Sequence, residues 1–172
     1  HEPMVMAALK SGRHVFVEKP LCLSRAELAE IDATIAEHPQ SVQVGFNRRF
    51  APASVELKLQ LDRVPGPKSA SYRVFAGKLD AGHWYANQDE SGGRVISEGC
   101  HFLDYFCFLF GSRPVRVTAQ TIWPAEGALP VPDSVTAQVE FADGSSGQLI
   151  YSAEGDTTYP KEHCTVFGSG IV

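Results

Sequence analysis

The sequence has no long apolar run, no surplus of basic residues and no closely spaced cysteine pair. Its apolar stretches fall short of the roughly 20 residues that a membrane-spanning helix needs, so we expect no membrane partner. Asp and Glu number 20 against 15 Lys and Arg, which gives a formal net charge of -5 and argues against a nucleic-acid partner. The four cysteines show no CxxC spacing. We therefore expect free thiols in a reducing compartment, and a cytoplasmic protein.

The first third of the chain alternates short apolar strands with amphipathic helices. This order is typical of βαβ units around a parallel sheet. Ser24 and Glu27 have the spacing of a capping box at the start of one of these helices. The expected helices are 3–11, 25–37 and 52–61, and the expected strands are 14–17 and 41–46.

After Pro65-Gly66-Pro67 the pattern changes to strands that alternate with period two, and the only long helix expected is 96–110. Asp143-Gly144 predicts a hairpin turn. We expect an antiparallel meander whose apolar face, including Val115, Val117 and Trp123, is covered by this helix. The fold class is thus α/β followed by α+β. A polar loop is expected at 77–93, and strands are expected at 68–76, 115–123, 134–141, 147–153 and 161–167.

Glu18-Lys19-Pro20 stands where the strand 14–17 ends. In an open α/β sheet, ligands bind beyond the carboxyl ends of the parallel strands. An X-Pro bond adopts the cis form at modest cost, which would turn Glu18 and Lys19 toward that crevice. The alternative is a plain strand-to-helix turn with solvated charges.

The stretch SGGRVISEGCHFLDYFCFLFG, residues 91–111, combines a glycine pair with a polar helical face. Ser97, His101 and Asp104 lie at i, i+4 and i+7, so an α-helix places them on one face. A carboxylate one turn from an imidazole suits the orientation of a proton-transfer group. The alternative is a half-buried histidine with a structural role.

A third group, Asn47, Arg48 and Arg49, follows the next expected strand in GFNRRFAP, residues 45–52. These side chains suit an anionic or hydroxyl-rich ligand. Alternatively, Arg49 pairs with a carboxylate of a helix or the sheet, and Asn47 caps the following helix. We favour a structural role for Arg48 and leave Asn47 open.

Taken in this order and spacing, AALKSGRHVFVEKPLCLSRAEL, GFNRRFAP and GGRVISEGCHFLDYFCFLFG resemble the Gfo/Idh/MocA oxidoreductase family, which includes glucose–fructose oxidoreductase and inositol dehydrogenases. The resemblance implies a Rossmann domain that binds NAD or NADP. It also implies a second domain on a large, open, mostly antiparallel sheet covered on one face by helices. We expect residues 1–45 to be the C-terminal remnant of the first domain. Residues 46–172 would form the substrate and oligomerisation domain, incomplete at its C-terminus.

The resemblance assigns catalytic roles to three residues. Lys19 matches the lysine that contacts and polarises the reacting hydroxyl, His101 matches the proton-transfer histidine, and Asp104 matches the carboxylate that would orient it. Ser97 stands where many members carry Asp. A hydroxyl there can bind substrate but cannot serve as a charged partner.

On the cofactor side, Glu18 matches the residue near the nicotinamide ribose, and we place Pro20 and Asn47 beside it. The sequence contains no GxGxxG, so the phosphate-binding turn would precede His1. We expect NAD or NADP as the cofactor of a longer parent protein. The 172-residue chain alone is expected to be inactive.

The expected substrate is a sugar, sugar derivative or cyclic polyol. Trp84 and Tyr85 precede the glycine pair and suit the faces of a sugar ring, although packing is an equal alternative. A homo-oligomer is expected through the more polar sheet face, because open sheets are generally covered.

Two other functions are open at this point. The chain can be a non-catalytic sugar-binding or oligomerisation module of the same fold. It can also be a zinc protein, although no ligand spacing supports one, so we expect no metal. The residues of such a zinc site would be Cys100, His101 and Cys107.

Overall fold

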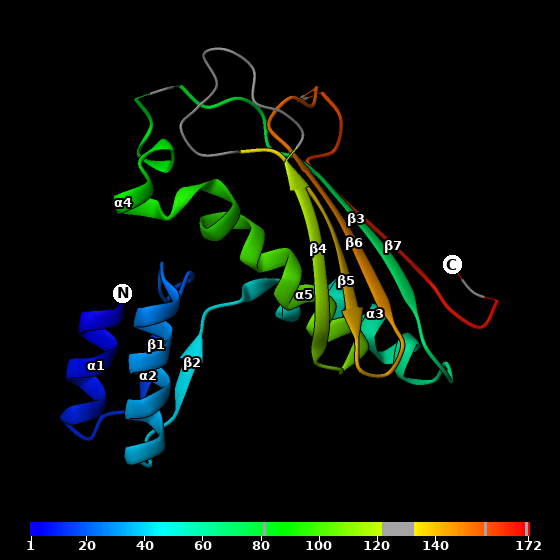
Figure 1. Ribbon diagram of the computed structural model, residues 1–172. Coiled ribbons are helices and arrows are strands. Elements are labelled where there is room, and N and C mark those ends of the chain that lie inside the picture. The colour runs from blue at the N-terminus through cyan, green and yellow to red at the C-terminus, as the bar shows by residue number, and fades with distance from the viewer. Residues whose placement is uncertain (81, 122–132, 157, 171) are drawn as a thin grey trace.

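The first part of the chain is a two-stranded parallel sheet beside two helices, α1 (Glu2–Lys10) and α2 (Arg25–Glu37) (Figure 1). The computed structural model describes residues 1–80, 82–121, 133–156, 158–170 and 172. Strand β1 (Val15–Val17) pairs in parallel with β2 (Val42–Val44), which confirms the βαβ prediction. Apolar side chains from both helices and from β1 form a core of their own: Val5, Leu9, Val17 and Ile31.

Helix α2 begins at the predicted capping residues. The Ser24 side chain accepts a hydrogen bond from the Glu27 backbone N–H at 3.2 Å, and the Glu27 carboxylate accepts one from Leu23 N–H at 2.7 Å. Two backbone donors at the helix start are thereby satisfied, which fixes the direction in which the chain leaves the Glu18–Pro20 turn.

The second part is built on a five-stranded sheet with the order β4-β5-β6-β3-β7. Three neighbouring pairs are antiparallel, whereas β3 and β6 run parallel. The strands β4, β5 and β6 do form the expected meander, and β5 and β6 bury the predicted faces. The strands are β3 (Ser69–Phe75), β4 (Pro114–Thr121), β5 (Val135–Phe141), β6 (Ser146–Ser152) and β7 (Glu162–Phe167).

The expectation of an antiparallel meander throughout is wrong at its far end. Strand β7 does not pair with β6 but with β3, which is inserted between the two. Alternation with period two reports which face of a strand is buried and carries no information about its neighbour.

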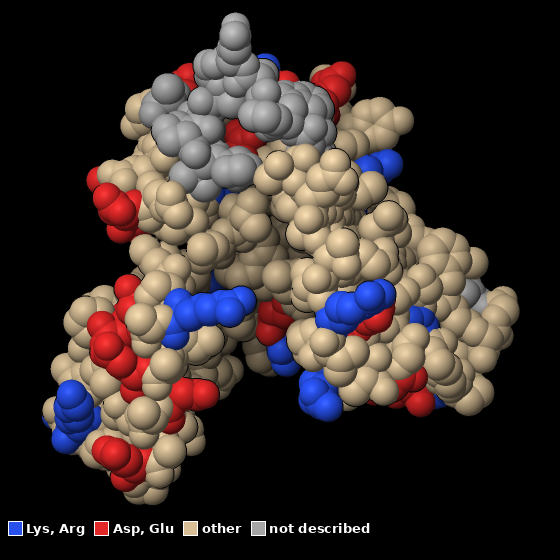
Figure 2. All heavy atoms as spheres, viewed as in Figure 1, with Lys and Arg blue, Asp and Glu red and all other residues tan. Residues whose placement is uncertain are grey.

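Helices α3 (Pro52–Asp62) and α5 (Cys100–Phe110) share one core with the sheet (Figure 1). Helix α5 supplies most of its aromatic side chains: Phe102, Tyr105, Phe106 and Phe110. Figure 2 shows a wide notch between the lobe of α1 and α2 and the lobe of the sheet. Between the two lobes the chain passes through the 3-10 turn η1 (Asn47–Phe50).

Strand β4 is exposed along its whole length, contrary to the expected burial of its apolar face. Val115 and Val117 are 51% and 57% exposed. The reason is that β4 lies at the edge of the sheet, whereas α5 packs over β6. Residue Trp123 of the expected strand lies outside the described residues.

The segment before α5 also differs from the prediction. The helix expected from residue 96 begins as a π turn, η3 (Val95–Gly99), and becomes α-helical only at Cys100. Within the expected loop 77–93, a 3-10 turn η2 (Trp84–Ala86) and a short helix α4 (Gln88–Ser91) are formed. Over the part of the chain that the structure describes, no helix has the length and apolarity to cross a membrane.

The contact between β6 and α5 leads to the first prediction. A Cβ at Gly147 would lie 2.7 Å from the Phe106 ring, a distance that real Cβ atoms essentially never show. We expect Gly147→Ala to lower the free energy of unfolding by about 1–3 kcal/mol, because the core must shift to accept the methyl group. Gly82→Ala is the matched control, since among the described residues, chain neighbours aside, nothing lies within 4 Å of its Cβ position. Equal urea midpoints for the two variants would contradict this packing.

Candidate active site

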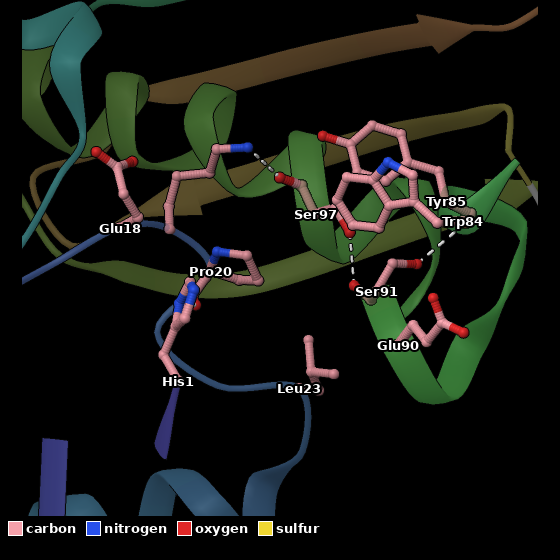
Figure 3. A pocket seen from close by; sticks show the side chains of 10 residues that line it. His1, Glu18, Pro20, Leu23, Trp84, Tyr85, Glu90, Ser91 and Ser97 are labelled. Carbon is pink, nitrogen blue, oxygen red and sulfur yellow. Dashed lines mark hydrogen bonds between the residues drawn. The ribbon is translucent and has the colours of Figure 1, made fainter. Parts of the chain in front are cut away.

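A pocket of about 260 Å³ lies where the turn after β1 meets the segment that leads into α5 (Figure 3). Its walls come from stretches of chain that are far apart in the sequence. Six of the lining residues are predicted site residues: Glu18, Lys19, Pro20, Trp84, Tyr85 and Ser97. The structure therefore brings these residues together from the first and second parts of the chain, whereas Asn47, His101 and Asp104 are not in the lining.

The Lys19 side chain joins the two parts directly. Its Nζ donates a hydrogen bond to the carbonyl oxygen of Ser97 at 2.8 Å (Figure 3). Ser97 lies in the π turn, a feature frequent at functional sites. The peptide bond between Lys19 and Pro20 is cis. The hydrogen bond to Ser97 holds the amine at the π turn that precedes His101.

Ser97 meets Lys19 through its backbone and not through its side chain. Its hydroxyl donates to the Ser91 carbonyl, 2.5 Å away, and the residue is 2% exposed. A hydroxyl has only one hydrogen to donate, so toward a substrate it can act only as an acceptor. Its assignment as a substrate-binding residue stays a prediction.

Glu18 lies at the carboxyl end of β1, next to the end of β2. The Glu18 carboxylate lies against Gly45, 3.4 Å from the position that a Cβ would take there. The Gly45 N–H donates to the Val17 carbonyl at 2.8 Å, which holds the two strand ends together. This edge of a parallel sheet is where dinucleotides bind in Rossmann folds.

Trp84 and Tyr85 form the opposite wall of the pocket (Figure 3). Their ring centroids are 4.1 Å apart, and Trp84 is 53% exposed. Burial is the main cause that raises the pKa of the Tyr85 hydroxyl, and the negative charge of Glu98 raises it further. Tyr85 is therefore a neutral hydrogen-bonding group beside an exposed indole face.

His101 stands at the start of α5, one turn after Ser97, and is 7% exposed. Its Nδ1 is buried and has no hydrogen-bond partner among the described residues. Burial lowers the pKa of the imidazole to about 4, and the positive charges of Arg48 and Lys19 act in the same direction. His101 is thus held as a neutral imidazole.

The expectation that Asp104 orients His101 is wrong. The Asp104 carboxylate accepts two hydrogen bonds from Arg49, one of them from Nε at 2.7 Å. Within the described ranges no hydrogen bond joins Asp104 to His101. A guanidinium fork matches both carboxylate oxygens at once, which a single imidazole N–H cannot do. Asp104 therefore fastens α5 to η1, and a catalytic role for it stays a prediction.

Arg48, the neighbouring arginine, is also paired with a carboxylate. Arg48 Nε donates to the Glu162 carboxylate at 3.1 Å, and Arg48 lies over the Phe102 ring, 4.8 Å from its centroid. The Tyr72 hydroxyl donates to Glu162 at 2.8 Å. These pairs agree with the structural role favoured for Arg48, and Arg49 has the carboxylate partner given above as the alternative to a ligand. Asn47 is exposed and does not line the pocket, so its cofactor contact stays a prediction.

A second buried network was missed by sequence reasoning. Arg94 is 4% exposed and donates to the Tyr151 hydroxyl at 2.6 Å and to the carbonyls of Ala76 and Gly77. The Glu98 carboxylate accepts from Tyr151 and, at 2.8 Å, from Lys161 Nζ. These contacts fasten the π turn to the sheet. The available signal was a pair of opposite charges, Arg94 and Glu98, four residues apart in the segment that leads into α5.

Four further pocket residues were also not anticipated: His1, Leu23, Glu90 and Ser91. His1 Nδ1 lies 2.8 Å from the Pro20 carbonyl oxygen, and Ser91 receives the Ser97 hydroxyl. Glu90 adds a second carboxylate to the pocket, at some distance along its wall from Glu18 (Figure 3). For a metal, the described part of the chain offers no group of three or more His, Cys, Asp or Glu.

The two parts of the chain match two family models. Residues 1–46 match the oxidoreductase family with an NAD-binding Rossmann fold, and residues 67–170 match the GFO/IDH/MocA C-terminal domain. The chain belongs to the GFO/IDH/MocA oxidoreductase family. The fold and the family expected from the three sequence blocks are thereby confirmed.

Individual members of the GFO/IDH/MocA family agree with this assignment. The scyllo-inositol 2-dehydrogenase (NAD(+)) of Bacillus subtilis is 30% identical over 170 residues, which cover 95% of this chain and 47% of that protein. The oxidoreductase domain protein of Kribbella flavida has the same fold, with a TM-score of 0.83 and 22% identity over 98% of this chain and 51% of that one. GenD2 from gentamicin A biosynthesis, solved in complex with NAD, has a TM-score of 0.75 and 26% identity over 96% of this chain and 48% of its own. The chain spans about half the length of these relatives.

The buried neutral imidazole predicts a loss of stability in mild acid. The folded-state pKa of His101, about 4, lies below its ordinary value of 6.5, so in this range the unfolded chain binds a proton that the folded chain does not. Its contribution to stability is complete above pH 6.5 and is lost as the pH falls toward 4. We expect urea unfolding at pH 7 and pH 5 to show a smaller loss for His101→Gln than for the parent sequence. His163→Gln, at an exposed position in β7, should leave the loss unchanged; equal losses in all three proteins would contradict the burial of a neutral His101.

Proposed function

We propose that the chain is part of an NAD(P)-dependent oxidoreductase that acts on the CH–OH group of a sugar, a sugar derivative or a cyclic polyol. The observation that carries the proposal is the contact between Lys19 Nζ and the Ser97 carbonyl. It holds a lysine amine in an aromatic-lined pocket, one helical turn before a buried neutral histidine.

The residues at the strand ends fit one end of a dinucleotide. Glu18 and Pro20 line the pocket at the carboxyl edge of the parallel sheet, where the Glu18 carboxylate lies against Gly45. We assign Glu18 and Pro20 to the nicotinamide side, with Asn47 as a further contact. When bound there, NAD or NADP supplies an acceptor or donor of hydride.

In this proposal, Lys19 and His101 exchange the proton of the reacting hydroxyl. The Lys19 amine already makes a hydrogen bond to a neutral carbonyl oxygen, and a substrate oxygen can replace that acceptor with little movement. Donors aimed at an oxygen that gains negative charge stabilise the transition state. His101 is not among the lining residues of the pocket, and we assign it to the site from its position in the first turn of α5, four residues after Ser97.

The size and lining of the pocket support a small hydroxylated substrate. A volume of about 260 Å³ is slightly below the range for small-molecule sites, about 300–1,000 Å³, which suits a small substrate. The exposed indole of Trp84 offers a flat apolar face, and Tyr85 and Glu90 offer polar atoms beside it. A ring with an apolar face and hydroxyls at its rim matches such a wall.

A homo-oligomer through the open sheet face is the partner that we propose besides the small-molecule substrate. Thr118, Gln138 and Gln148 are exposed opposite one another on β4, β5 and β6, so they share the face of the sheet turned away from the core. An open sheet face and an edge strand of this kind are generally covered by a partner. Figure 2 shows Lys and Arg scattered over the visible face, and we propose neither nucleic acid nor membrane as a partner.

A longer parent protein provides the test of catalysis. We expect Lys19→Met to reduce kcat at least about 100-fold with little change in cofactor affinity, because the amine acts on the substrate oxygen and general acid–base groups commonly contribute 10²–10⁴-fold. The matched control is Lys10→Met, at an exposed position in α1. A panel of sugars and polyols with NAD and NADP would show turnover, and an unchanged kcat for Lys19→Met would refute the role of Lys19.

The isolated 172-residue chain is expected to be inactive and to bind NAD(P)H weakly. Hydride transfer needs the reacting carbons held about 3–3.5 Å apart, and this chain carries no GxGxxG turn for the pyrophosphate. Calorimetric titration with NADH and NADPH measures this directly. Micromolar binding by the chain alone would contradict the expectation.

A further inference from the structure

The second carboxylate of the pocket, Glu90, has its position set by a neighbouring amide. Glu90 lies in α4 and lines the pocket. The Asn87 Nδ2 donates to Glu90 Oε1 at 2.7 Å, and the Asn87 Oδ1 accepts from the Asp89 N–H at 3.0 Å. Asn87 therefore caps α4 and also holds one oxygen of this carboxylate. The other oxygen has no hydrogen bond within the described part of the chain, so it is available to a ligand.

Ser91 ties the helix that carries Glu90 to the turn that binds Lys19. It is 2% exposed, and its hydroxyl donates to the Asn87 carbonyl at 2.9 Å. Its own carbonyl accepts from the Ser97 hydroxyl at 2.5 Å, and the Ser97 carbonyl holds Lys19 Nζ. An unbroken series of hydrogen bonds thus fixes the Glu90 carboxylate and the Lys19 amine in one pocket before any ligand is bound.

The charges in the lining favour an uncharged ligand. Three lining side chains are acidic or basic, besides the imidazole of His1: Glu18, Lys19 and Glu90. Glu18 and Glu90 stand at opposite ends of the group of residues drawn in Figure 3. An anionic ligand that fills the pocket brings its charge near one carboxylate or the other, and like charges placed together weaken binding. A hydroxyl, in contrast, can donate a hydrogen bond to a carboxylate oxygen.

Resting on the proposed function, we propose that Glu90 is a specificity-determining residue that accepts hydrogen bonds from ring hydroxyls and excludes acidic sugars. The substrate class is then an uncharged sugar or cyclic polyol, and not a sugar phosphate or a sugar acid. Without the charge of Glu90, a substrate carboxylate or phosphate would pair with the Lys19 amine, which the reacting oxygen needs. The exposed indole of Trp84, in the same wall as Glu90, supplies the apolar face against which the ring lies.

The test is a binding titration of the 172-residue chain, read from the NMR signal of the Trp84 indole N–H, which Trp84→Phe assigns. The probes are two matched pairs: myo-inositol with an inositol monophosphate, and methyl glucoside with methyl glucuronide. We expect the uncharged member of each pair to shift the signal. The acidic member should bind at least about 10-fold more weakly, as charges a few ångströms apart near a protein surface can cause. Equal affinities within the pairs, or no shift with any of the four probes, would overturn the proposal.

Glu90→Gln removes the charge and keeps an oxygen that can accept from Asn87. We expect the two affinities within each pair to become similar, because the acidic probe gains affinity and the uncharged probe loses some. Asp89→Asn is the matched control, since Asp89 is the adjacent exposed carboxylate of α4 and is not in the lining. It should keep the preference of the parent sequence. A preference that survives Glu90→Gln, or that falls equally in Asp89→Asn, would overturn the role of Glu90.

Asn87→Ser separates the orientation of the carboxylate from its charge. Serine can still cap α4, but it offers no amide to Glu90. We expect the uncharged probes to bind more weakly, whereas the acidic probes stay excluded; unchanged affinity for the uncharged probes would contradict the hydrogen-bonding role of Glu90.

These titrations need neither turnover nor a cofactor, so they are independent of the test of catalysis. A longer parent protein that turns over acidic and uncharged sugars equally well would overturn the role of Glu90 and leave the oxidoreductase function standing. A parent protein without turnover of any sugar or polyol would overturn the proposed function, while the charge preference of the pocket would still be measurable in the 172-residue chain.

Discussion

The hydrogen bond from Lys19 Nζ to the Ser97 carbonyl connects groups that are 78 residues apart in the sequence. The pocket exists because these two segments meet. The turn after β1 supplies one wall, and the stretch from η2 to the π turn supplies the other. If Lys19 pointed elsewhere, the aromatic wall and the carboxyl edge of the parallel sheet would be separate surfaces.

Ion pairs and buried polar networks fix the relative position of the two segments that form the pocket. Arg48 and Arg49 tie η1 to the sheet and to α5, and Arg94 ties the π turn to β6 and to the end of β3. Partly buried pairs of this kind are not strong sources of net stability, because desolvation offsets much of their attraction. Their effect here is geometric. They fix where the π turn stands relative to the strand ends.

Much of the fold follows from local rules that the sequence obeys. Ser24 and Glu27 form their predicted contact, and Leu149, Tyr151 and Val139 are buried as the period-two pattern requires. The pocket's polar groups could also be anticipated, since Lys19 follows a buried strand and Ser97 lies in a polar helical segment. The order of strands around β3 could not, because alternation does not identify neighbours.

The partners of the charged residues also could not be predicted from the sequence. Helical spacing brought Asp104 within reach of His101, but a guanidinium from η1 binds the same carboxylate, and its approach depends on tertiary structure. The π turn could not be predicted either. Five residues are too short a stretch to alter an apolar pattern that α5 then dominates, yet this turn decides that Ser97 presents its carbonyl to Lys19.

The most direct measurement is a crystal structure of a longer parent protein with NAD(P) and a bound sugar or polyol. The account predicts that one substrate hydroxyl replaces the Ser97 carbonyl as the acceptor of Lys19 Nζ, at about 3 Å, with the His101 imidazole within hydrogen-bond reach of the same oxygen. It would be contradicted by a substrate bound away from Lys19 while Lys19 stays on the Ser97 carbonyl. In that case this junction would join the two parts of the chain without taking part in the chemistry.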